Sequence, residues 1–387
     1  MKVCIAIDSF KGSLSSREAG EAAARGIRKI YPDADISICP IADGGEGTVD
    51  ALIYGERGKR IELTVTGPLG ESTDAYYGIL NGRDIAVIEM ATAAGLPLVP
   101  EEKRDPLYTT TYGVGEIILD AVHRGCRDFI IGIGGSATND GGVGMLSALG
   151  FEFLDAKGRD IPMGAIGLRD LDQIKTDKVL PELSECTFNI ACDVKNPLCG
   201  ENGCSRIFAP QKGATPESVR DMDVWLERYA DITKTVFEHS DKSFPGAGAA
   251  GGLGFAFLSY LGGTLCSGID LVMTHTGIED TVKDSDLIIT GEGRLDGQSY
   301  MGKVPIGVAR IAKKYGKTVV AFCGAATDDA HKSNAYGIDA FFPILRAPCS
   351  LAEAMDVKNA SRNLELTSQQ VASLYKTLVS VDKTYKL

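Results

Sequence analysis

Several polar loops of this chain combine glycine with charged side chains, and most of them follow a short apolar run. The first, at residues 8–15, places Asp8 and Lys11 beside a glycine and several hydroxyls, at the start of a predicted helix whose free N–H groups favour anions. Phosphoryl transfer needs such N–H groups or lysine for the phosphates, carboxylates for magnesium, and a group that accepts or orients a hydroxyl proton. The alternative for this loop alone is an ordinary strand-to-helix turn.

Two further loops carry carboxylates. Residues 42–48 bring Asp43 and Glu46 together beside glycines that allow close backbone approach, which suits a metal ion, although a solvated turn is the alternative. Residues 290–303 follow a predicted strand at the sheet edge where open α/β folds bind ligands, and they carry Glu292, Arg294, Asp296 and Lys303. Val304 stands where the P-loop pattern requires serine or threonine, so this segment is not a P-loop.

Another long glycine-rich loop, GIGGSATNDGGVG at residues 132–144, also follows an apolar run. Its glycines can expose N–H groups, and its polar side chains offer oxygen ligands. A second run, GAGAAGGLG at residues 246–254, formally matches the dinucleotide pattern. The polar segment EHSDKSFP precedes it in place of an apolar strand, so we reject NAD binding and expect a helix N-terminus used for close packing or for phosphate approach.

Two smaller segments carry single candidates. Asp193 lies just past a predicted strand at residues 187–191, and Lys212 lies in a glycine turn; each alone is more often structural than catalytic. The four histidines lie in separate contexts, without a metal pair or a triad, which disfavours zinc and hydrolase chemistry.

The elements that position these loops begin with a βαβ unit. A strand at residues 3–7 precedes a helix opened by a capping box of Ser15 and Glu18, and a strand at 36–41 follows. The rhythm returns in strands at 287–289, 318–323 and 340–345, with a helix to residue 316 and a helical tail from 351. This pattern predicts an α/β fold with a doubly wound, mostly parallel Rossmann-like sheet of about five strands.

The middle of the chain has a different pattern of predicted elements. Strands at 61–65, 73–80 and 85–90 follow one another without helices, which suggests hairpins. We therefore predict a discontinuous Rossmann-like domain, residues 1–60 plus 246–387, interrupted by an inserted mixed α/β domain at 61–245. We expect the active site in the cleft between them.

Composition limits the classes of function. The 387 residues favour two domains, and a net charge of -12 without long charged blocks argues against nucleic acid binding. The ten cysteines include no CxxC pair, which indicates thiols in a reducing cytosol. The N-terminal apolar run is too short for a signal peptide, and no run approaches the ~20 residues that span a bilayer. We expect a cytoplasmic protein without membrane or nucleic acid partners; the sequence leaves monomer or homodimer open.

Many of these segments, in the same order from residue 8 to about 307, resemble the bacterial glycerate kinases that phosphorylate D-glycerate. The segments are DSFKGSLS, PIADGGEGTVDAL, VTGPLG, IEMATAAGL, TTTYGVGE, IIGIGGSATNDGG, ACDVKNPL, PQKGATPE, GAGAAGGLG and ITGEGRLDGQ. The resemblance implies an alcohol-accepting phosphotransferase that uses ATP and Mg²⁺, with 2-phosphoglycerate favoured over 3-phosphoglycerate. It also implies a Rossmann-like domain interrupted by a mixed-sheet domain. Ile7, where we expect proline, and residues 323–329 depart from the family pattern, and we assign the latter no role.

These observations give one set of predicted roles. The catalytic residues are Asp193, the preferred base, with Asp8 and Lys11. The phosphate and nucleotide contacts are Gly134, Gly135, Ser136, Thr138, Asn139, Gly248, Gly251 and Lys303. The substrate contacts are Ser9, Ser13, Lys212 and Arg294, and the metal ligands are Asp43, Asp140 and Asp296. The alternatives are a kinase of another small hydroxy acid and a nucleotide sensor without chemistry.

Overall fold

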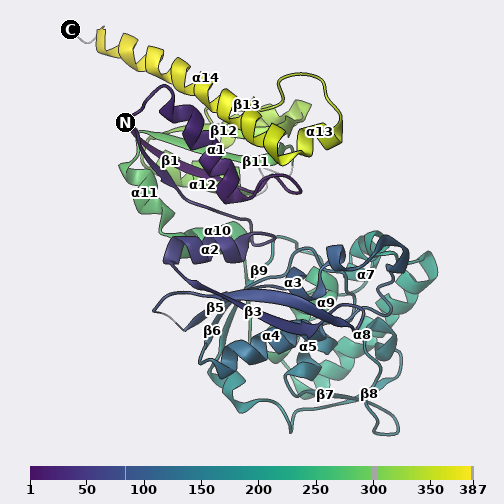
Figure 1. Cartoon of the computed structure of the whole chain (residues 1–387). Helices are drawn as coiled ribbons and strands as arrows, with labels where there is room; N and C mark the ends of the chain where they lie inside the picture. The colour runs from purple at the N-terminus through teal and green to yellow at the C-terminus, as the bar shows by residue number, and fades with distance from the viewer. Residues whose placement is uncertain (83, 298–302, 385–387) are drawn as a thin grey trace. The chain divides into compact units, whose positions relative to one another are not determined.

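The computed structural model describes residues 1–82, 84–297 and 303–384, which form two compact units (Figure 1). Unit 1 comprises Met1–Asp43, Asp50–Glu56 and Val272–Leu387, and unit 2 comprises Gly44–Val49 and Arg57–Leu271. Two of the passages from unit 2 to unit 1 lie inside helices, Thr48–Glu56 (α2) and Gly268–Thr276 (α10).

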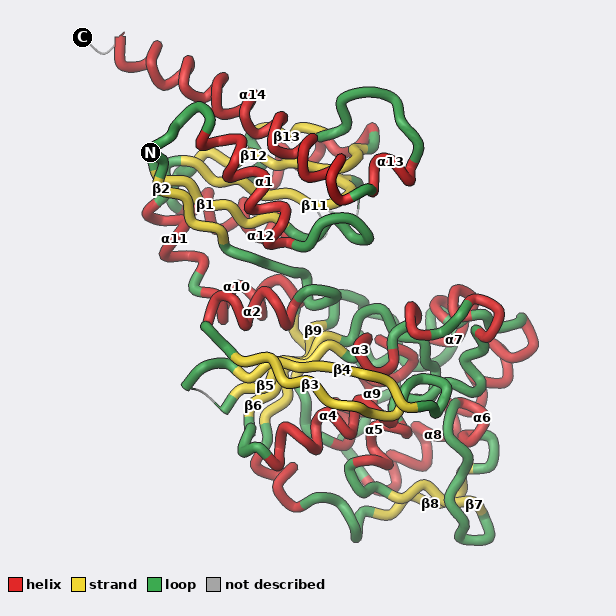
Figure 2. The backbone as a smooth tube through the Cα atoms, in the orientation of Figure 1, coloured by secondary structure: helices red, strands yellow, loops and turns green. Residues whose placement is uncertain are grey.

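Unit 1 is built on five parallel strands in the order β13-β12-β11-β1-β2 (Figure 2). They are β1 (Lys2–Ile7), β2 (Asp35–Ile38), β11 (Leu287–Leu295), β12 (Thr318–Ala326) and β13 (Ala340–Pro343). From β1 the chain adds β2 on one side and the later strands on the other. The crevice between β1 and β11 is therefore the topological switch point, where open α/β sheets bind ligands. The predicted doubly wound sheet of about five strands is confirmed.

Helices cover both faces of this sheet. The helices α1 (Ser16–Arg28) and α14 (Val357–Thr384) share a buried apolar core with the strands, while α11 (Ile278–Asp284) and α12 (Val304–Lys314) pack against β1 and β11. The short elements η6 (Asp328–Tyr336) and α13 (Leu351–Met355) follow β12 and β13. The predicted capping box opens α1: Glu18 N donates to Ser15 Oγ over 3.2 Å, and Ser15 N donates to the Glu18 carboxylate over 2.9 Å.

Strand β11 is longer than predicted. The sequence places a loop from residue 290 onward, but β11 continues to Leu295 because β12 continues beside it, with Arg294 opposite Ala325. Glycine and charged residues in TGEGR have weak strand propensity, and pairing with a neighbouring strand overrides it. As a result, the charged residues of this segment project from a sheet strand.

Unit 2 is built on a mixed sheet in the order β10-β9-β6-β5-β4-β3. The strands are β3 (Lys59–Thr66), β4 (Ser72–Ile79), β5 (Ile85–Glu89), β6 (Asp128–Gly132), β9 (Thr187–Ala191) and β10 (Thr264–Cys266). Strands β3, β4 and β5 pair antiparallel, as the hairpin pattern predicts, and β5, β6, β9 and β10 are parallel. A separate hairpin joins β7 (Glu152–Asp155) to β8 (Leu171–Lys175).

The helical segments of unit 2 include four that join the strands in one apolar core: α4 (Tyr112–His123), α5 (Val143–Ala148), α8 (Pro216–Val236) and α9 (Ala249–Tyr260). The shorter ones are α3 (Ala91–Ala94), η1 (Leu96–Leu98), η2 (Glu101–Lys103), α6 (Ala165–Leu168), η3 (Pro181–Glu185), α7 (Cys204–Phe208) and η4 (Pro210–Lys212). Residues 246–271, expected to return to the first domain, lie in unit 2 because α9 packs there: Phe257 contacts Phe188 of β9, and Phe255 contacts Tyr229 of α8.

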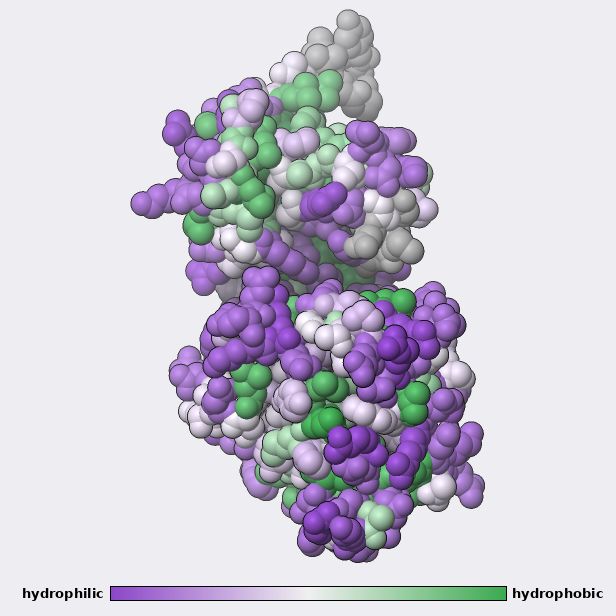
Figure 3. Space-filling view, turned by 90° about the vertical axis from the view of Figure 1, so that its right-hand side faces the viewer, coloured by the Kyte–Doolittle hydropathy of each residue, from purple (hydrophilic) through white to green (hydrophobic). Residues whose placement is uncertain are grey.

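One face of the molecule is largely polar (Figure 3). Hydrophilic residues cover most of the face seen in Figure 3, and apolar residues gather in separate areas. Among the helices that the structure describes, none combines the length and the apolar character needed to cross a membrane.

The close contact between α1 and α14 makes Gly26 a test of unit 1 packing. A Cβ at this position would lie 2.1 Å from the backbone oxygen of Glu365 in α14, so the two helices would have to separate. We expect Gly26→Ala to lower the melting temperature by about 3 to 10 °C. Gly55→Ala in α2 is the matched control, because its Cβ would meet Thr276 at 3.8 Å, an ordinary contact. Equal melting temperatures for the two variants would contradict this packing.

Candidate functional site

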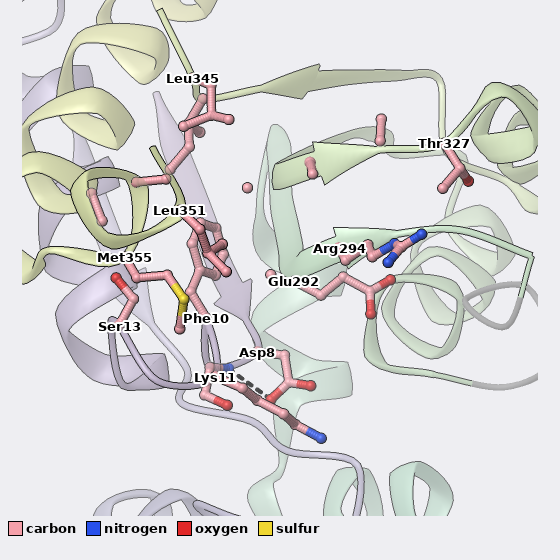
Figure 4. Close-up of a pocket in the computed structure, with 18 of the residues that line it drawn as sticks. Asp8, Phe10, Lys11, Ser13, Glu292, Arg294, Thr327, Leu345, Leu351 and Met355 are labelled. Carbon is pink, nitrogen blue, oxygen red and sulfur yellow. Dashed lines mark hydrogen bonds between the residues drawn. The ribbon is translucent and has the colours of Figure 1, made fainter. Parts of the chain in front are cut away.

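A cavity of about 520 Å³ lies in unit 1 at the carboxyl ends of the sheet strands (Figure 4). The segments that follow β1 and β13 line it, together with the ends of β11 and β12 and part of α13. It brings together seven of the predicted site residues: Asp8, Ser9, Lys11, Ser13, Asp43, Arg294 and Lys303. The switch point of the sheet is therefore also the place where the charged loops of unit 1 meet.

Asp8 is the first residue after β1 and is only 4% exposed. Its N–H donates to Gly291 O over 2.9 Å, and its Oδ1 accepts from Ser9 N over 2.7 Å. Burial and the nearby carboxylates of Asp43 and Glu292 raise the pKa of Asp8 to about 8, while the Ser9 N–H and Lys11 oppose the rise. A cation at this end of the cavity would stabilise the ionised carboxylates.

Two lysines face these carboxylates. Lys11 Nζ lies 3.8 Å from Asp43 Oδ2, and Lys303 Nζ lies 3.6 Å from Glu292 Oε2. Both separations exceed ordinary hydrogen-bond lengths, so neither ion pair holds its lysine tightly. Arg294 Nε is 3.5 Å from Asp296 Oδ2, which links a predicted substrate contact to a predicted metal ligand.

Hydroxyl groups also line the cavity or hold its segments. Ser9 Oγ and Ser13 Oγ are buried and have no hydrogen-bond partner among the described residues, so each can donate to a ligand. Ser16 Oγ donates to Ile7 O over 2.6 Å and accepts from Ile41 N over 2.9 Å. Ser16 thereby ties the end of β1 to the segment after β2 that leads to Asp43, a positioning role that the sequence analysis missed.

The opposite end of the cavity is apolar. Figure 4 shows Phe10, Leu345, Leu351 and Met355 on one side and the carboxylates of Asp8 and Glu292 on the other. The sequence analysis assigned none of these four apolar residues and gave no role to residues 324–327, which also line the cavity. The signal available for the latter was their position after β12, beside β11 in a parallel sheet.

The predicted sites in unit 2 are mostly buried. Asp140 is fully buried: its Oδ2 accepts from Thr111 N and Thr111 Oγ1, both over 2.8 Å, and from Gly144 N, while its Oδ1 accepts from Gly142 N. Burial raises the pKa of Asp140, and these hydrogen bonds oppose the rise. This arrangement fixes the starts of α4 and α5, so the structure favours a structural role for Asp140 over metal binding.

The neighbouring residues of this loop also face protein atoms. Thr138 and Asn139 are fully buried, and Asn139 Nδ2 donates to Ser205 Oγ over 2.9 Å. Gly251 has a φ of +68°, and a Cβ there would lie 2.1 Å from Thr138 O. A Cβ on Gly248 would lie 2.2 Å from Pro197 O. These glycines allow backbone segments to pack closely, which is the packing alternative considered for GAGAAGG.

Lys212 is buried beside the same loop. Its Nζ donates to Ser136 Oγ over 2.7 Å and to Thr138 O over 2.6 Å. Burial lowers the pKa of Lys212 to about 8. This lysine holds the loop from within, whereas Gly134 and Gly135 at the loop's start are exposed.

Asp193 is exposed just past the end of β9, where its Oδ1 accepts from Gly268 N over 3.1 Å. A carboxylate has about four acceptor sites, so this hydrogen bond does not exhaust the accepting capacity of Asp193. The parallel strands β5, β6 and β9 end on this same edge of the sheet, so Asp193 and the exposed glycines 134 and 135 belong to one edge of unit 2.

The described residues include no group of three or more histidine, cysteine or carboxylate side chains placed to hold a metal ion. Magnesium in phosphoryl-transfer sites is usually held by one or two carboxylates together with substrate phosphates and water. Asp8 and Asp43 meet that requirement. Both carboxylates line the cavity, and they lie close enough that the charge of Asp43 contributes to the raised pKa of Asp8.

The family model, two relatives and a solved structure that resemble this chain all name the same activity. The family model named Glycerate kinase family matches residues 3–376. A glycerate 2-kinase from Escherichia coli K12 is 49% identical over 95% of this chain and 98% of its own, and a glycerate kinase from Bacillus subtilis 168 is 45% identical over 97% and 98%. A crystal structure from Salmonella typhimurium LT2, provisionally assigned as glycerate kinase 2, is 46% identical, with a TM-score of 0.88 over 98% of this chain and 99% of that one.

The hydrogen bonds to Asp140 predict a large stability loss on its replacement. In Asp140→Asn an amide N–H₂ group faces the N–H and O–H donors whose hydrogen bonds the carboxylate accepts. We therefore expect the free energy of unfolding of unit 2 to fall by about 2 to 4 kcal/mol. Fluorescence of Trp225, the single tryptophan, reports on this unit because its side chain packs against the unit 2 core. Unchanged stability together with a weaker response of activity to Mg²⁺ would instead support the metal-ligand role.

Lys212 predicts a pH dependence of stability. Its folded pKa of about 8 lies below the ordinary 10.5, so the unfolded chain binds more protons between these values and stability rises with pH across that window. Lys212→Met removes the titrating group and with it this rise of stability with pH. The stability of the variant relative to the parent should therefore fall by about 3 kcal/mol between pH 7 and pH 10.5. Urea unfolding followed by Trp225 fluorescence measures it, with exposed Lys175→Met as control; a pH-independent difference would argue against a desolvated Lys212.

Proposed function

Because the chain belongs to the glycerate kinase family, we propose that it transfers the γ-phosphoryl group of ATP to a hydroxyl of D-glycerate and forms 2-phosphoglycerate. The name of the Escherichia coli relative, a glycerate 2-kinase, supports the choice of the 2-hydroxyl. We also propose that the reaction takes place in the cytoplasm, as the composition suggests.

The observation that carries the proposal is the unit 1 cavity with its two chemically different ends. One end has three carboxylates and two lysines, and the other is apolar. A nucleoside triphosphate has the same division. Its triphosphate chain is anionic, and the base at its other end is flat, with faces of low polarity. The position at a sheet switch point supports the same ligand class.

Within this hypothesis, Lys11 and Lys303 bind the phosphates. Their carboxylate partners lie 3.8 and 3.6 Å away, so each ammonium can turn to a phosphate oxygen without breaking a short hydrogen bond. The unpartnered hydroxyl of Ser9 can donate to the same ligand. Arg294 is the proposed partner of the glycerate carboxylate, since guanidinium binds carboxylate in a bidentate manner.

Magnesium fits the polar end of the cavity, where Asp8 and Asp43 would hold it with the phosphates. When bound, magnesium neutralises charge that develops on the transferred group. The chain's own contribution is positional: the β1 to α1 turn fixes Asp8, and Ser16 fixes the approach to Asp43. Asp193 remains the proposed base that accepts or orients the hydroxyl proton.

The first experiment is ADP release with Mg²⁺ and ATP against D-glycerate, L-glycerate, lactate and no acceptor, with phosphorus NMR of the product. Release that requires D-glycerate, with phosphate on the 2-hydroxyl, supports the proposal. Another productive acceptor would identify a kinase of a different hydroxy acid. Folded protein that binds ATP without consuming it under any condition would indicate a nucleotide sensor.

The role of Asp193 predicts a kinetic signature. Asparagine retains the oxygen that accepts from Gly268 N but cannot take a proton, so Asp193→Asn should lower kcat about 100-fold or more and leave KM for both substrates within about threefold. The exposed Asp177→Asn is the control and should match the parent. Turnover of Asp193→Asn within tenfold of the parent would remove this residue from the role.

A further inference from the structure

The apolar end of the unit 1 cavity has a specific composition. We call Phe10, Leu345, Leu351 and Met355 the apolar wall; the smaller or aliphatic side chains of Ile344, Ala354 and Ala360 adjoin it. Leu351 is 75% exposed, Leu345 41% and Met355 37%, although all three line the cavity. Covering these side chains would remove apolar surface from water, which favours binding of a ligand with an apolar face.

The segments that carry the wall are held in place by contacts outside it. Helix α13 begins at a capping box in which Ser350 N and Oγ donate to the Glu353 carboxylate over 2.9 and 2.8 Å. Met355 packs on the β1 to α1 turn, because a Cβ on Gly12 would lie 2.7 Å from Met355 Cε. The turn itself is closed by Phe10 N, which donates to Leu14 O over 2.7 Å. Both sides of the wall are therefore held by hydrogen bonds outside it.

Glycerate does not suit this wall. It is a three-carbon acid with a carboxylate and two hydroxyls, so it has little apolar surface to place against four large side chains. A purine or pyrimidine base offers two apolar faces, and the cavity volume of about 520 Å³ lies in the range of small-molecule sites. The continuity of the wall with the lysines and carboxylates identifies the occupant as the base of the phosphoryl donor.

We propose that the apolar wall binds the nucleobase of the donor by its faces and discriminates weakly between bases, so that ATP, GTP and CTP all serve as donors. The inference rests on the proposed function. Strong discrimination, of 10⁴-fold or more, arises where a site hydrogen-bonds the groups that distinguish two ligands. The four wall side chains have no such groups. The nearby Ser13 hydroxyl can donate or accept a hydrogen bond, so it can pair with a donor or with an acceptor at the edge of a base.

Steady-state kinetics with D-glycerate tests both parts of the inference. We expect kcat/KM for GTP and CTP within about tenfold of the value for ATP. Leu351→Ala should raise KM for each nucleotide about tenfold and leave KM for D-glycerate unchanged. Because Leu351 is mostly exposed, its truncation leaves the fold intact. The matched control is Leu374→Ala, an exposed leucine of α14 outside the cavity, which should match the parent.

Inorganic tripolyphosphate separates the wall from the polar end, because it has the anionic chain and no base. Its inhibition constant against ATP should be the same for Leu351→Ala and the parent. An ATP preference above 1,000-fold would overturn weak discrimination, and an unchanged nucleotide KM in Leu351→Ala would overturn the wall as base site. If the parent phosphorylates no acceptor, the proposed function fails, and calorimetric ATP binding to parent and variant still decides the role of the wall.

Discussion

The central position of β1 in its parallel sheet is the constraint on which the unit 1 site depends. Because β1 pairs with β11 on one side and β2 on the other, the chain that leaves it must enter the crevice between neighbouring strand ends. Asp8 extends the pairing by one hydrogen bond, to Gly291 O, and is therefore held at the base of the cavity with its carboxylate out of water. Its raised pKa follows from this position. The carboxylates gathered there favour a ligand that brings positive charge, and the lysines favour one that brings negative charge, a combination that a metal–nucleotide complex provides.

Unit 2 uses similar residue types for a different purpose. A glycine next to a ligand and a glycine next to another backbone segment both lack a Cβ for the same reason, so their sequences look alike. At Gly251 the neighbour is Thr138 O, and at Gly248 it is Pro197 O, so these glycines serve packing. Asp140 likewise receives four hydrogen bonds from the loop and helix starts around it. Such a buried network makes one arrangement of the loop stable, and it presents the exposed Gly134 and Gly135 in a fixed position.

Sequence patterns predicted what depends on local chemistry or on general rules of parallel sheets. The capping box at Ser15 and the apolar runs of β1, β9 and β12 gave correct elements, and strand-end position brought Asp8, Asp43 and Lys303 together. The patterns were insufficient where contacts with residues distant in sequence determine the structure. Pairing with β12 extends β11, and packing against α8 and β9 places α9 in unit 2. Burial of the 138–140 segment also depends on distant partners. The apolar wall was missed because leucine and methionine near the chain end resemble core residues, and only the cavity distinguishes them.

The lysines illustrate how burial decides between structure and binding. Lys212 donates two short hydrogen bonds inside the protein, and withdrawing it would leave Thr138 O without this donor in a dry environment. Lys11 is mostly exposed and its carboxylate partner is 3.8 Å away, so exchanging that partner for a phosphate costs little. Lys303 is intermediate in exposure, with a similarly loose partner. A lysine that must bind and release an anion in each turnover needs the second kind of environment, which is why the lysines of the unit 1 cavity, rather than Lys212, suit the phosphates.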